Sequence, residues 1–328
     1  MLRVEPQNRP LLKQGMKGDW VVFLQDQLNG CGYGPMNLDG DFGSQTLAEV
    51  NRFQKNIGLK VDGIVGSITW TNLDKHKKII GWIPEWPSSL TLRGMAGADS
   101  LQRVQAFMIP EAQKLMGTLP RFWGRYFQGN LSSGEYFRAT ENQILRNAGI
   151  RILPISRQTN RVDETQQVGE QLGSLHARDL LNTFGESYLA SIQVDGLYFF
   201  LDVEPIDPLS VGFYIGWSTA VIKSSTRVRF LPAVYLNAAD STTTKNLSTA
   251  MKSGAQCHGL WVAHYGNNQA LISPWDKNQA RVATPVPCKV LMRQYAGDIK
   301  NGLYDLNQMN PFLDNQELVL KRLILPPA

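Results

Sequence analysis

The feature that most constrains this 328-residue sequence is a regular alternation of short apolar runs with longer amphipathic stretches after residue 93. Strands that alternate with helices form a parallel sheet, and this segment is long enough for the sheet to close on itself. The pattern therefore predicts a (β/α)8 TIM-like barrel in which some late helices are reduced or missing. The eight predicted strands are residues 95–99, 121–127, 150–155, 196–204, 230–236, 259–265, 289–295 and 303–306.

An internal repeat organises the residues before this segment. The pattern D-G-x-x-G-S-x-T occurs at residues 39–46 and again at 62–69. In each copy the Asp-Gly pair favours a tight turn, the second glycine permits a positive φ, and the Ser or Thr can cap a following helix. Apolar residues at helical spacing precede each copy. The sequence therefore predicts a compact small all-α (three-helix) domain that ends near Leu73.

This segment resembles the small peptidoglycan-binding domain found at one end of many cell-wall hydrolases, over roughly residues 10–75. The resemblance implies that the domain binds peptidoglycan. Turn chemistry alone explains the same residues, so a purely structural role for them is the alternative. The residues on which the expected binding role rests are Asp39, Gly40, Phe42, Gly43, Thr46, Asp62, Gly63, Gly66, Thr69 and Trp70.

Between the two parts lies a stretch with a basic cluster followed by Pro84, Trp86 and Pro87, which interrupts the helical periodicity. Such a composition is typical of a linker. The expected organisation is a peptidoglycan-binding domain at residues 1–80, a linker at 81–92, and a glycoside-hydrolase-like barrel at 93–328.

Charge and hydropathy exclude several partners. The formal net charge is +5, and the only dense basic cluster is His76, Lys77 and Lys78, which is too little for a nucleic-acid-binding protein. The first ten residues carry Arg3, Glu5 and Arg9 without an apolar stretch, so we expect no signal peptide, and no run of about 18 apolar residues predicts a membrane span. We expect a monomer without membrane insertion, made in the cytoplasm and delivered to the cell wall by holin-type lysis or specialised export.

The inventory of reactive residues argues against other chemistries. The four histidines form no H-E-x-x-H motif, and no G-x-S-x-G motif occurs, so we expect no metal, no cofactor and no serine nucleophile. The odd count of three cysteines fits a reducing compartment. Cys257 and Cys288 could pair, although buried thiols are favoured.

The strongest catalytic signal is the acid pair that closes the run Tyr198 to Glu204. Alternate residues of a strand share a face, so Asp202 and Glu204 lie side by side. Two carboxyls at one apolar strand end can acquire different pKa values, and this suits a general acid beside an ionised partner. The pair therefore points to glycoside hydrolysis, with Glu204 as the acid and Asp202 ionised. An exposed pair without function is the alternative.

Two further acids, Asp99 and Asp305, also adjoin predicted strands. Asp99 could instead cap a helix that starts at Leu101, and Asp305 could start a turn. A long loop at residues 267–287 could cover the site and offer Trp275 as a sugar platform.

The strand ends together resemble the glycoside-hydrolase-like barrels related to family 25 lysozymes, over about residues 92–312. The shared segments are 97–99, 124–126, 153–155, 202–204, 293–295 and 305–307. The resemblance implies a muramidase-like site with Glu204 as proton donor and Asp99, Asp202 and Asp305 around the sugar. The expected substrate-binding residues are Tyr126, Arg125, Tyr198, Tyr235, Tyr265, Gln294, Tyr295, Asn307 and Trp275.

These observations predict a peptidoglycan hydrolase, a lysozyme-like glycosidase that a wall-binding domain directs to its substrate. A bacteriolytic phage endolysin is the simplest case. The alternative is a non-catalytic peptidoglycan-binding protein, associated with a phage tail or a secretion system, in which the barrel is a degenerate hydrolase.

Overall fold

The computed structural model describes residues 5–76, 93–127, 138–157, 160–204, 206–276, 278–313 and 315–328. These residues form two compact units, one built mainly from residues before position 90 and the other mainly from those after it. The predicted linker at residues 81–92 lies outside the described residues.

The N-terminal unit contains the three predicted helices. After a short 3-10 helix, η1 (Pro6–Asn8), come α1 (Asp19–Gly30), α2 (Ser44–Asn56) and α3 (Ser67–Lys75). α2 and α3 each begin directly after the second glycine of a repeat copy, so each copy is followed by a helix as predicted. The predicted Ser or Thr cap and the positive φ of the second glycine are wrong, because that glycine is itself the N-cap with a negative φ and the positive φ falls on the first glycine, Gly40 or Gly63. The core of the unit is aromatic and aliphatic; its fully buried members include Phe23, Phe42, Phe53, Val65, Trp70 and Leu73.

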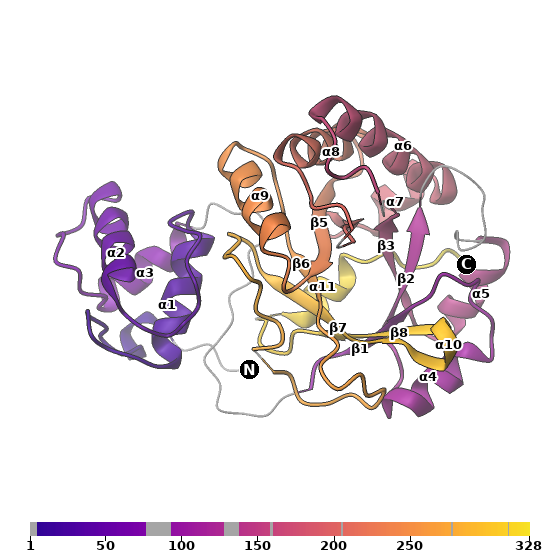
Figure 1. Ribbon diagram of the computed structural model, residues 1–328, viewed down its shortest axis with the longest axis horizontal. Helices are drawn as coiled ribbons and strands as arrows, with labels where there is room; N and C mark the ends of the chain where they lie inside the picture. Colours follow the sequence, from indigo (N-terminus) through magenta and orange to yellow (C-terminus); the bar gives the residue numbers. More distant parts are fainter. Residues whose placement is uncertain are drawn as a thin grey trace. The chain divides into compact units, whose positions relative to one another are not determined.

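The C-terminal unit is a closed barrel of eight strands in sequence order. Figure 1 shows the barrel with α6, α8 and α9 outside it. All eight predicted strands are present. They are β1 (Ala96–Asp99), β2 (Phe122–Phe127), β3 (Arg151–Ser156), β4 (Leu197–Asp202), β5 (Phe230–Asn237), β6 (Leu260–Ala263), β7 (Val290–Asp298) and β8 (Tyr304–Met309).

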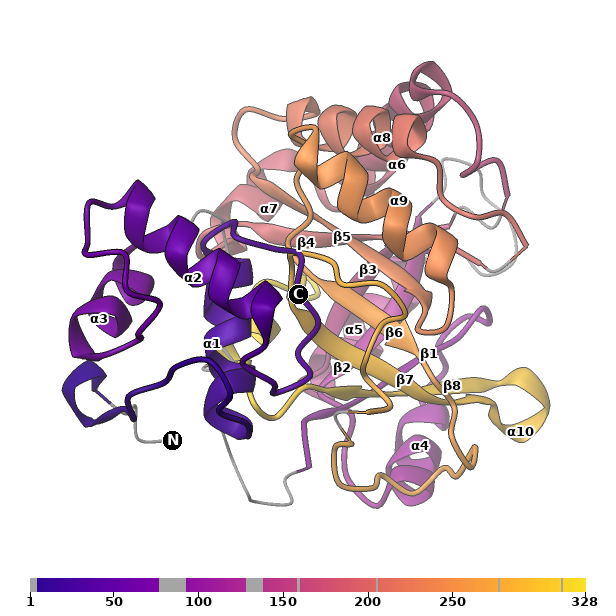
Figure 2. The same cartoon turned by 60° about the vertical axis from the view of Figure 1, so that its left-hand side comes forward.

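The barrel is mixed rather than fully parallel. β1 to β7 pair in parallel, but β8 runs antiparallel to both β7 and β1. The prediction of a wholly parallel sheet is therefore wrong for β8. The physical reason is the connection: only α10 (Ile299–Gly302) and Leu303 separate β7 from β8, and a parallel crossover needs a dozen or more residues. Figure 2 shows this hairpin with α10 at its tip.

Helices fill most of the earlier strand connections. The described helices are α4 (Met108–Met116), α5 (Arg138–Asn147), α6 (Gln166–Phe184), α7 (Glu186–Ile192), α8 (Val211–Lys223), α9 (Ser241–Lys252) and α11 (Gln316–Lys321). The described residues between β6 and β7 form no helix. This agrees with the expectation that some late helices are missing. None of the helices described here is both long and apolar enough to cross a membrane.

All three cysteine side chains are buried. The thiol of Cys31 donates to the carbonyl oxygen of Leu73 at 3.3 Å, and the thiol of Cys257 donates to that of Gly259 at 3.5 Å. These contacts agree with the expected buried thiols.

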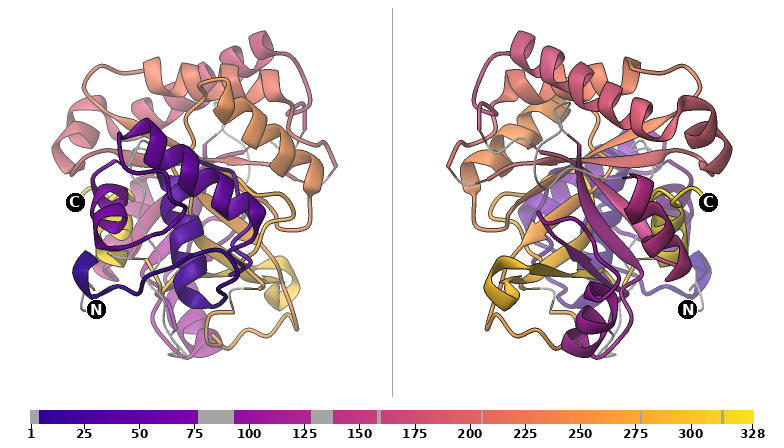
Figure 3. Two further views of the ribbon diagram at one scale, coloured as in Figure 1. Left: turned by 90° about the vertical axis from the view of Figure 1, so that its left-hand side faces the viewer. Right: turned by 90° about the vertical axis from the view of Figure 1, so that its right-hand side faces the viewer.

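The tightest helix packing in the barrel unit joins α6 to α8, which lie side by side (Figure 3). Each helix places two glycines four residues apart at the contact. A Cβ atom added to Gly216 would lie 2.1 Å from the carbonyl oxygen of Gln166, so the two backbones touch where no side chain fits. At Gly212 the nearest atom would be 3.2 Å away.

We expect Gly216→Ala to lower the free energy of unfolding by at least about 2 kcal/mol, because its methyl group meets backbone that cannot yield. Gly212→Ala is the matched control on the same helix. Its contact is looser, and alanine favours helix over glycine by about 1 kcal/mol, so it should be nearly neutral. Urea unfolding of both variants measures the difference; equal destabilisation would contradict this account of the packing.

Candidate active site at the carboxyl ends of the barrel strands

Four carboxyl groups gather at one edge of the barrel. Asp99 and Asp202 are the last residues of β1 and β4, and Glu204 follows β4 by two positions. Asp305 is near the start of β8, which lies at the same edge because β8 is antiparallel. Asp99 and Asp305 are direct partners across the β1–β8 ladder. The structure thus brings together the four acids predicted as catalytic.

Asp99 is the most enclosed of the four, with 1% of its surface exposed. Its Oδ1 accepts a hydrogen bond from the Tyr126 hydroxyl at 3.1 Å. Its Oδ2 accepts two more, from Gln294 Nε2 at 3.2 Å and from Asn307 Nδ2 at 2.7 Å. The first helix after β1 begins only at Met108, so Asp99 belongs to this polar network and does not cap a helix at position 101.

Two glycines make room for this arrangement. A Cβ atom at Gly124 of β2 would lie 2.5 Å from Cβ of Asp99, and one at Gly97 would lie 2.1 Å from the ring of Phe122. Gly124 therefore leaves room for Asp99, and Gly97 leaves room for the ring of Phe122 on the neighbouring strand.

Burial disfavours the charged form of each acid in this cluster. It raises the pKa of Asp202 to about 8, and the negative charge of Glu204 adds to the effect. Burial also raises the pKa of Asp99 well above its usual range, with Asp305 contributing and the three hydrogen bonds opposing. The pKa of Glu204 rises for the same reasons, burial first and then Asp305, and burial raises that of Asp305 as well.

The raised pKa of Glu204 agrees with the expected general acid. The expectation of an ionised Asp202 is wrong, because a carboxyl that titrates near pH 8 carries a proton at neutral pH. The physical reason is depth: Asp202 is 5% exposed, whereas Glu204 is half-buried. Sequence spacing placed the two acids on one face but could not tell which was deeper.

Two tyrosines join the network through Gln294. The hydroxyl of Tyr235 donates to Gln294 Oε1 at 2.6 Å, and that of Tyr265 donates to the same oxygen at 3.0 Å. Tyr235 is buried, while Tyr265 is 42% exposed and is the more accessible of the two rings. Five of the predicted substrate-binding residues therefore surround Asp99: Tyr126, Tyr235, Tyr265, Gln294 and Asn307.

Arg125 and Tyr198 lie elsewhere. The Arg125 guanidinium forms an ion pair with Glu141 of α5 at 2.7 Å, and both side chains are fully buried. Tyr198 is near the start of β4, at the opposite end of that strand from Asp202, where its hydroxyl accepts a hydrogen bond from Arg322 at 3.1 Å. These contacts give both residues a structural role in the barrel wall and floor.

Tyr295 and Trp275 contact the loop between β6 and β7. The Tyr295 hydroxyl donates to the carbonyl oxygen of Ala270 at 2.9 Å. Trp275 is only 7% exposed, and the guanidinium of Arg293 lies 5.4 Å from its ring centre. Trp275 is therefore part of the packing of this loop and does not present an open platform for a sugar.

Sequence reasoning missed Trp261 of β6. Its indole nitrogen donates to Oδ1 of Asn307 at 2.8 Å, so it belongs to the same polar network. The only available signal was its position in an apolar strand, which is equally typical of an ordinary core residue. Within the part of the chain that the structure describes, no three His, Cys, Asp or Glu side chains are grouped to hold a metal ion.

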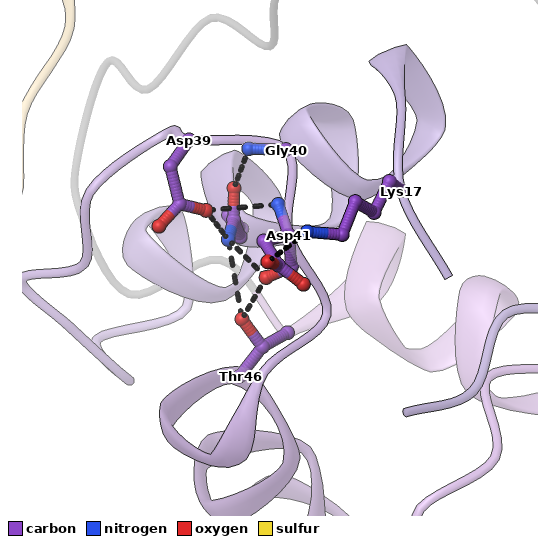
Figure 4. Close-up of polar contacts among 6 residues, drawn as sticks. Lys17, Asp39, Gly40, Asp41 and Thr46 are labelled. Atoms are coloured by element: carbon purple, nitrogen blue, oxygen red, sulfur yellow. Dashed lines mark hydrogen bonds and ion pairs between the residues drawn. The ribbon is translucent and has the colours of Figure 1, made fainter. Parts of the chain in front are cut away.

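In the N-terminal unit, the first repeat copy is organised by one buried side chain, Gln25. Its Nε2 donates to Oδ1 of Asp39 at 2.7 Å and to Oγ1 of Thr46 at 3.2 Å, while its Oε1 accepts from the backbone N–H of Gly40 at 3.0 Å. Figure 4 shows Asp39, Gly40, Asp41 and Thr46 gathered around these contacts.

Gln54 repeats this arrangement in the second copy. Its Nε2 donates to Oδ1 of Asp62 at 3.0 Å and to Oγ1 of Thr69 at 3.5 Å, and its Oε1 accepts from the backbone N–H of Gly63 at 3.0 Å. The two loops share the same geometry, and in each it depends on a glutamine in the preceding helix.

The remaining repeat residues are also structural. Phe42 and Trp70 are fully buried, and Gly43 and Gly66 are the N-cap residues of α2 and α3. The contacts of the ten predicted binding residues account for the shape of the domain. Direct contact between these residues and peptidoglycan stays a prediction.

Residues 17–73 match the family described as putative peptidoglycan binding domain. An uncharacterised protein from the bpoA1 3' region of Kitasatospora aureofaciens is 45% identical over 80 residues, which are 24% of this chain and 67% of that protein. A spore cortex-lytic enzyme of Halalkalibacterium halodurans is 37% identical over 65 residues, which are 20% of this chain and 20% of the enzyme. The chain thus spans about a fifth of that enzyme.

For the barrel, a crystal structure of an uncharacterised B. stearothermophilus protein is similar, with a TM-score of 0.53 and 20% sequence identity. The match covers 68% of this chain and 99% of that chain. At this level of identity the likeness concerns the fold alone.

We expect Asp202→Asn to stabilise the protein increasingly as pH rises. Below the ordinary pKa of 3.8 the carboxyl is protonated in the folded and the unfolded chain. Above it the unfolded chain releases the proton while the folded chain keeps it until about pH 8, so the wild type loses stability through this window and the variant does not. Urea unfolding should show a gain of at least about 2 kcal/mol at pH 8 over that at pH 4. A gain independent of pH would contradict the burial of this acid.

Proposed function

Because this chain carries, in its N-terminal unit, a member of the peptidoglycan-binding domain family, we propose that the barrel is a glycosidase that hydrolyses the glycan strands of peptidoglycan. In this proposal residues 1–80 bind the wall and residues 93–328, in the TIM-barrel arrangement, cleave a glycosidic bond as a muramidase does. Delivery to the wall as in a phage endolysin is part of the proposal.

The observation that carries the proposal is the position of Glu204 among the four acids. It is half-buried and follows a strand that ends in the deeply buried Asp202. Burial and Asp305 raise the pKa of Glu204, which favours the protonated form that a general acid needs, and its partial exposure lets it reach a bound glycan. This combination of a retained proton and access to substrate is what a general acid requires.

The reaction follows from these properties. Glu204 donates its proton to the oxygen of the leaving sugar as the glycosidic bond breaks, and positive charge develops on the remaining ring. Asp99 and Asp305 face each other across the β1–β8 ladder and titrate as a pair, so ionisation of either one places a negative charge that stabilises this ring. A water molecule then bonds to the anomeric carbon of this sugar and gives one of its protons to Glu204. Water attacks either directly or after the acetamido group of the substrate has first bonded to the same carbon.

We expect Glu204→Gln to reduce turnover about 10² to 10⁴-fold, because glutamine keeps the shape and hydrogen bonding of the side chain but has no proton to transfer. Binding of the glycan should change little. The measurement is the release of new reducing ends from purified peptidoglycan, with mass analysis of the products. Glu170→Gln, an exposed change on α6, is the control and should retain full activity.

Failure of the wild-type protein to release reducing ends between about pH 4 and pH 8 would remove the glycosidase assignment. The same experiment would then favour a barrel that binds glycan without cleaving it. A Glu204→Gln variant as active as the wild type would leave the enzyme intact and remove Glu204 from the reaction.

We also expect the N-terminal unit, expressed alone as residues 1–80, to sediment with insoluble peptidoglycan, and residues 93–328 alone to sediment more weakly. A tethered binding unit raises the effective concentration of the barrel at its substrate without changing its chemistry. Insoluble cellulose is the control surface. An N-terminal unit that remains in the supernatant would contradict the division of labour.

A further inference from the structure

Two side-chain amides donate to the same oxygen of Asp99, and the orientation of each is fixed by a donor that binds its amide oxygen. Asn307 donates Nδ2–H to Oδ2 of Asp99 at 2.7 Å, while its Oδ1 accepts the indole N–H of Trp261 at 2.8 Å. An indole nitrogen can only donate, so it selects the amide oxygen as its partner. Asn307 must therefore present its NH2 group to Asp99.

Gln294 is oriented by the same principle. Its Oε1 accepts hydroxyl hydrogens from Tyr235 and Tyr265, which leaves Nε2 for Asp99. The two amides differ in how firmly they are held: two donors fix Gln294, but among the described residues a single donor, Trp261, faces the amide oxygen of Asn307. Loss of one donor should therefore release Asn307 more readily than Gln294.

Trp261 is buried in the barrel interior. It is 1% exposed, its ring lies 4.5 Å from that of Tyr235, and it meets the ring of Phe200 edge-on at 6.1 Å. A side chain this enclosed in the barrel interior has no surface for a glycan. Trp261 reaches the acidic cluster through its hydrogen bond to Asn307 and through its ring contact with Tyr235, and only the hydrogen bond depends on the indole N–H.

We propose that Trp261 is a positioning residue of the acidic site: its indole N–H fixes the amide of Asn307 and so keeps a donated hydrogen bond on Asp99. Without that N–H the amide is free to turn its oxygen toward Asp99, where two acceptors would oppose each other and favour a protonated carboxyl. The catalytic consequence rests on the proposed glycosidase, but the effect on Asp99 does not.

The surroundings of Asp99 define what a titration reports. Asp305 faces it from β8 and Tyr126 from β2, while the tyrosines at 235 and 265 lie within electrostatic reach from the β5 and β6 side. The negative charge of Asp202 also helps to raise the pKa of Tyr126. Trp261→Phe leaves all of these groups in place but changes the packing against Tyr235, so a comparison in the Asn307→Leu background separates the turned amide from that change.

The test is Trp261→Phe, which keeps an aromatic ring in the core and removes the N–H. Trp217→Phe is the matched control, because Trp217 is equally buried but its N–H donates to His176 at 3.3 Å, away from the acidic cluster. Carboxyl carbon NMR of 13C-Asp-labelled full-length protein, with Asp99 assigned through Asp99→Asn, follows the titration. Turnover of peptidoglycan is measured on the same samples.

We expect Trp261→Phe to raise the pKa of Asp99 and to lower kcat about 10-fold with little change in KM, while Trp217→Phe changes neither. An unaltered Asp99 titration in Trp261→Phe, or an equal change in the control, would overturn the proposal. A shifted titration in a protein that never cleaves peptidoglycan would support the positioning role and overturn only the proposed function.

Asn307→Leu keeps the inference testable if Trp261→Phe does not fold. This variant has a similar volume but no amide, so it should raise the pKa of Asp99 at least as much. If Asn307 is the link, adding Trp261→Phe to Asn307→Leu should change the titration no further. Additive shifts in the double variant would overturn the route through Asn307.

Discussion

The site depends on one constraint, the direct pairing of Asp99 with Asp305 across the seam where β8 closes the barrel. Two carboxyls placed opposite each other in a ladder repel, and burial adds to the cost of ionising them. Burial favours the protonated form of Asp99, and three hydrogen bonds donated to this carboxyl offset part of the cost of ionising it. A parallel β8 would have placed Asp305 at the other end of the barrel, so the short β7–β8 hairpin is what creates the acidic cluster.

In both units, side-chain amides of fixed orientation satisfy the hydrogen-bonding groups of buried polar residues. In the N-terminal unit Gln25 and Gln54 each donate to an aspartate and accept from a glycine N–H, and this defines the two repeat loops. In the barrel, Gln294 and Asn307 donate to Asp99 and accept from buried hydroxyl or indole groups. An amide offers a donor and an acceptor at fixed spacing, so it can connect a carboxyl to a neighbouring donor inside a core.

Sequence patterns predicted the eight strands, the three N-terminal helices and the acids that meet at the barrel edge, because these follow from periodicity and from where strands end. They could not predict the direction of β8, which depends on the length of one hairpin. They also assigned Arg125 and Trp275 to the sugar site. A residue type does not reveal its partner, and the structure pairs Arg125 with Glu141 and Trp275 with Arg293.

The barrel combines buried acids with buried bases whose effects on stability oppose each other. Burial lowers the pKa of His176 and His258 to about 4, so protonating them costs stability as pH falls below their ordinary value of 6.5. Burial raises the pKa of Asp202 to about 8, so its contribution is lost as pH rises from 3.8. Below pH 6.5 the histidines and Asp202 change the free energy of unfolding in opposite directions as pH changes. Above pH 6.5 only Asp202 still changes it. Between about pH 4 and pH 8 these three groups are therefore uncharged in the folded barrel.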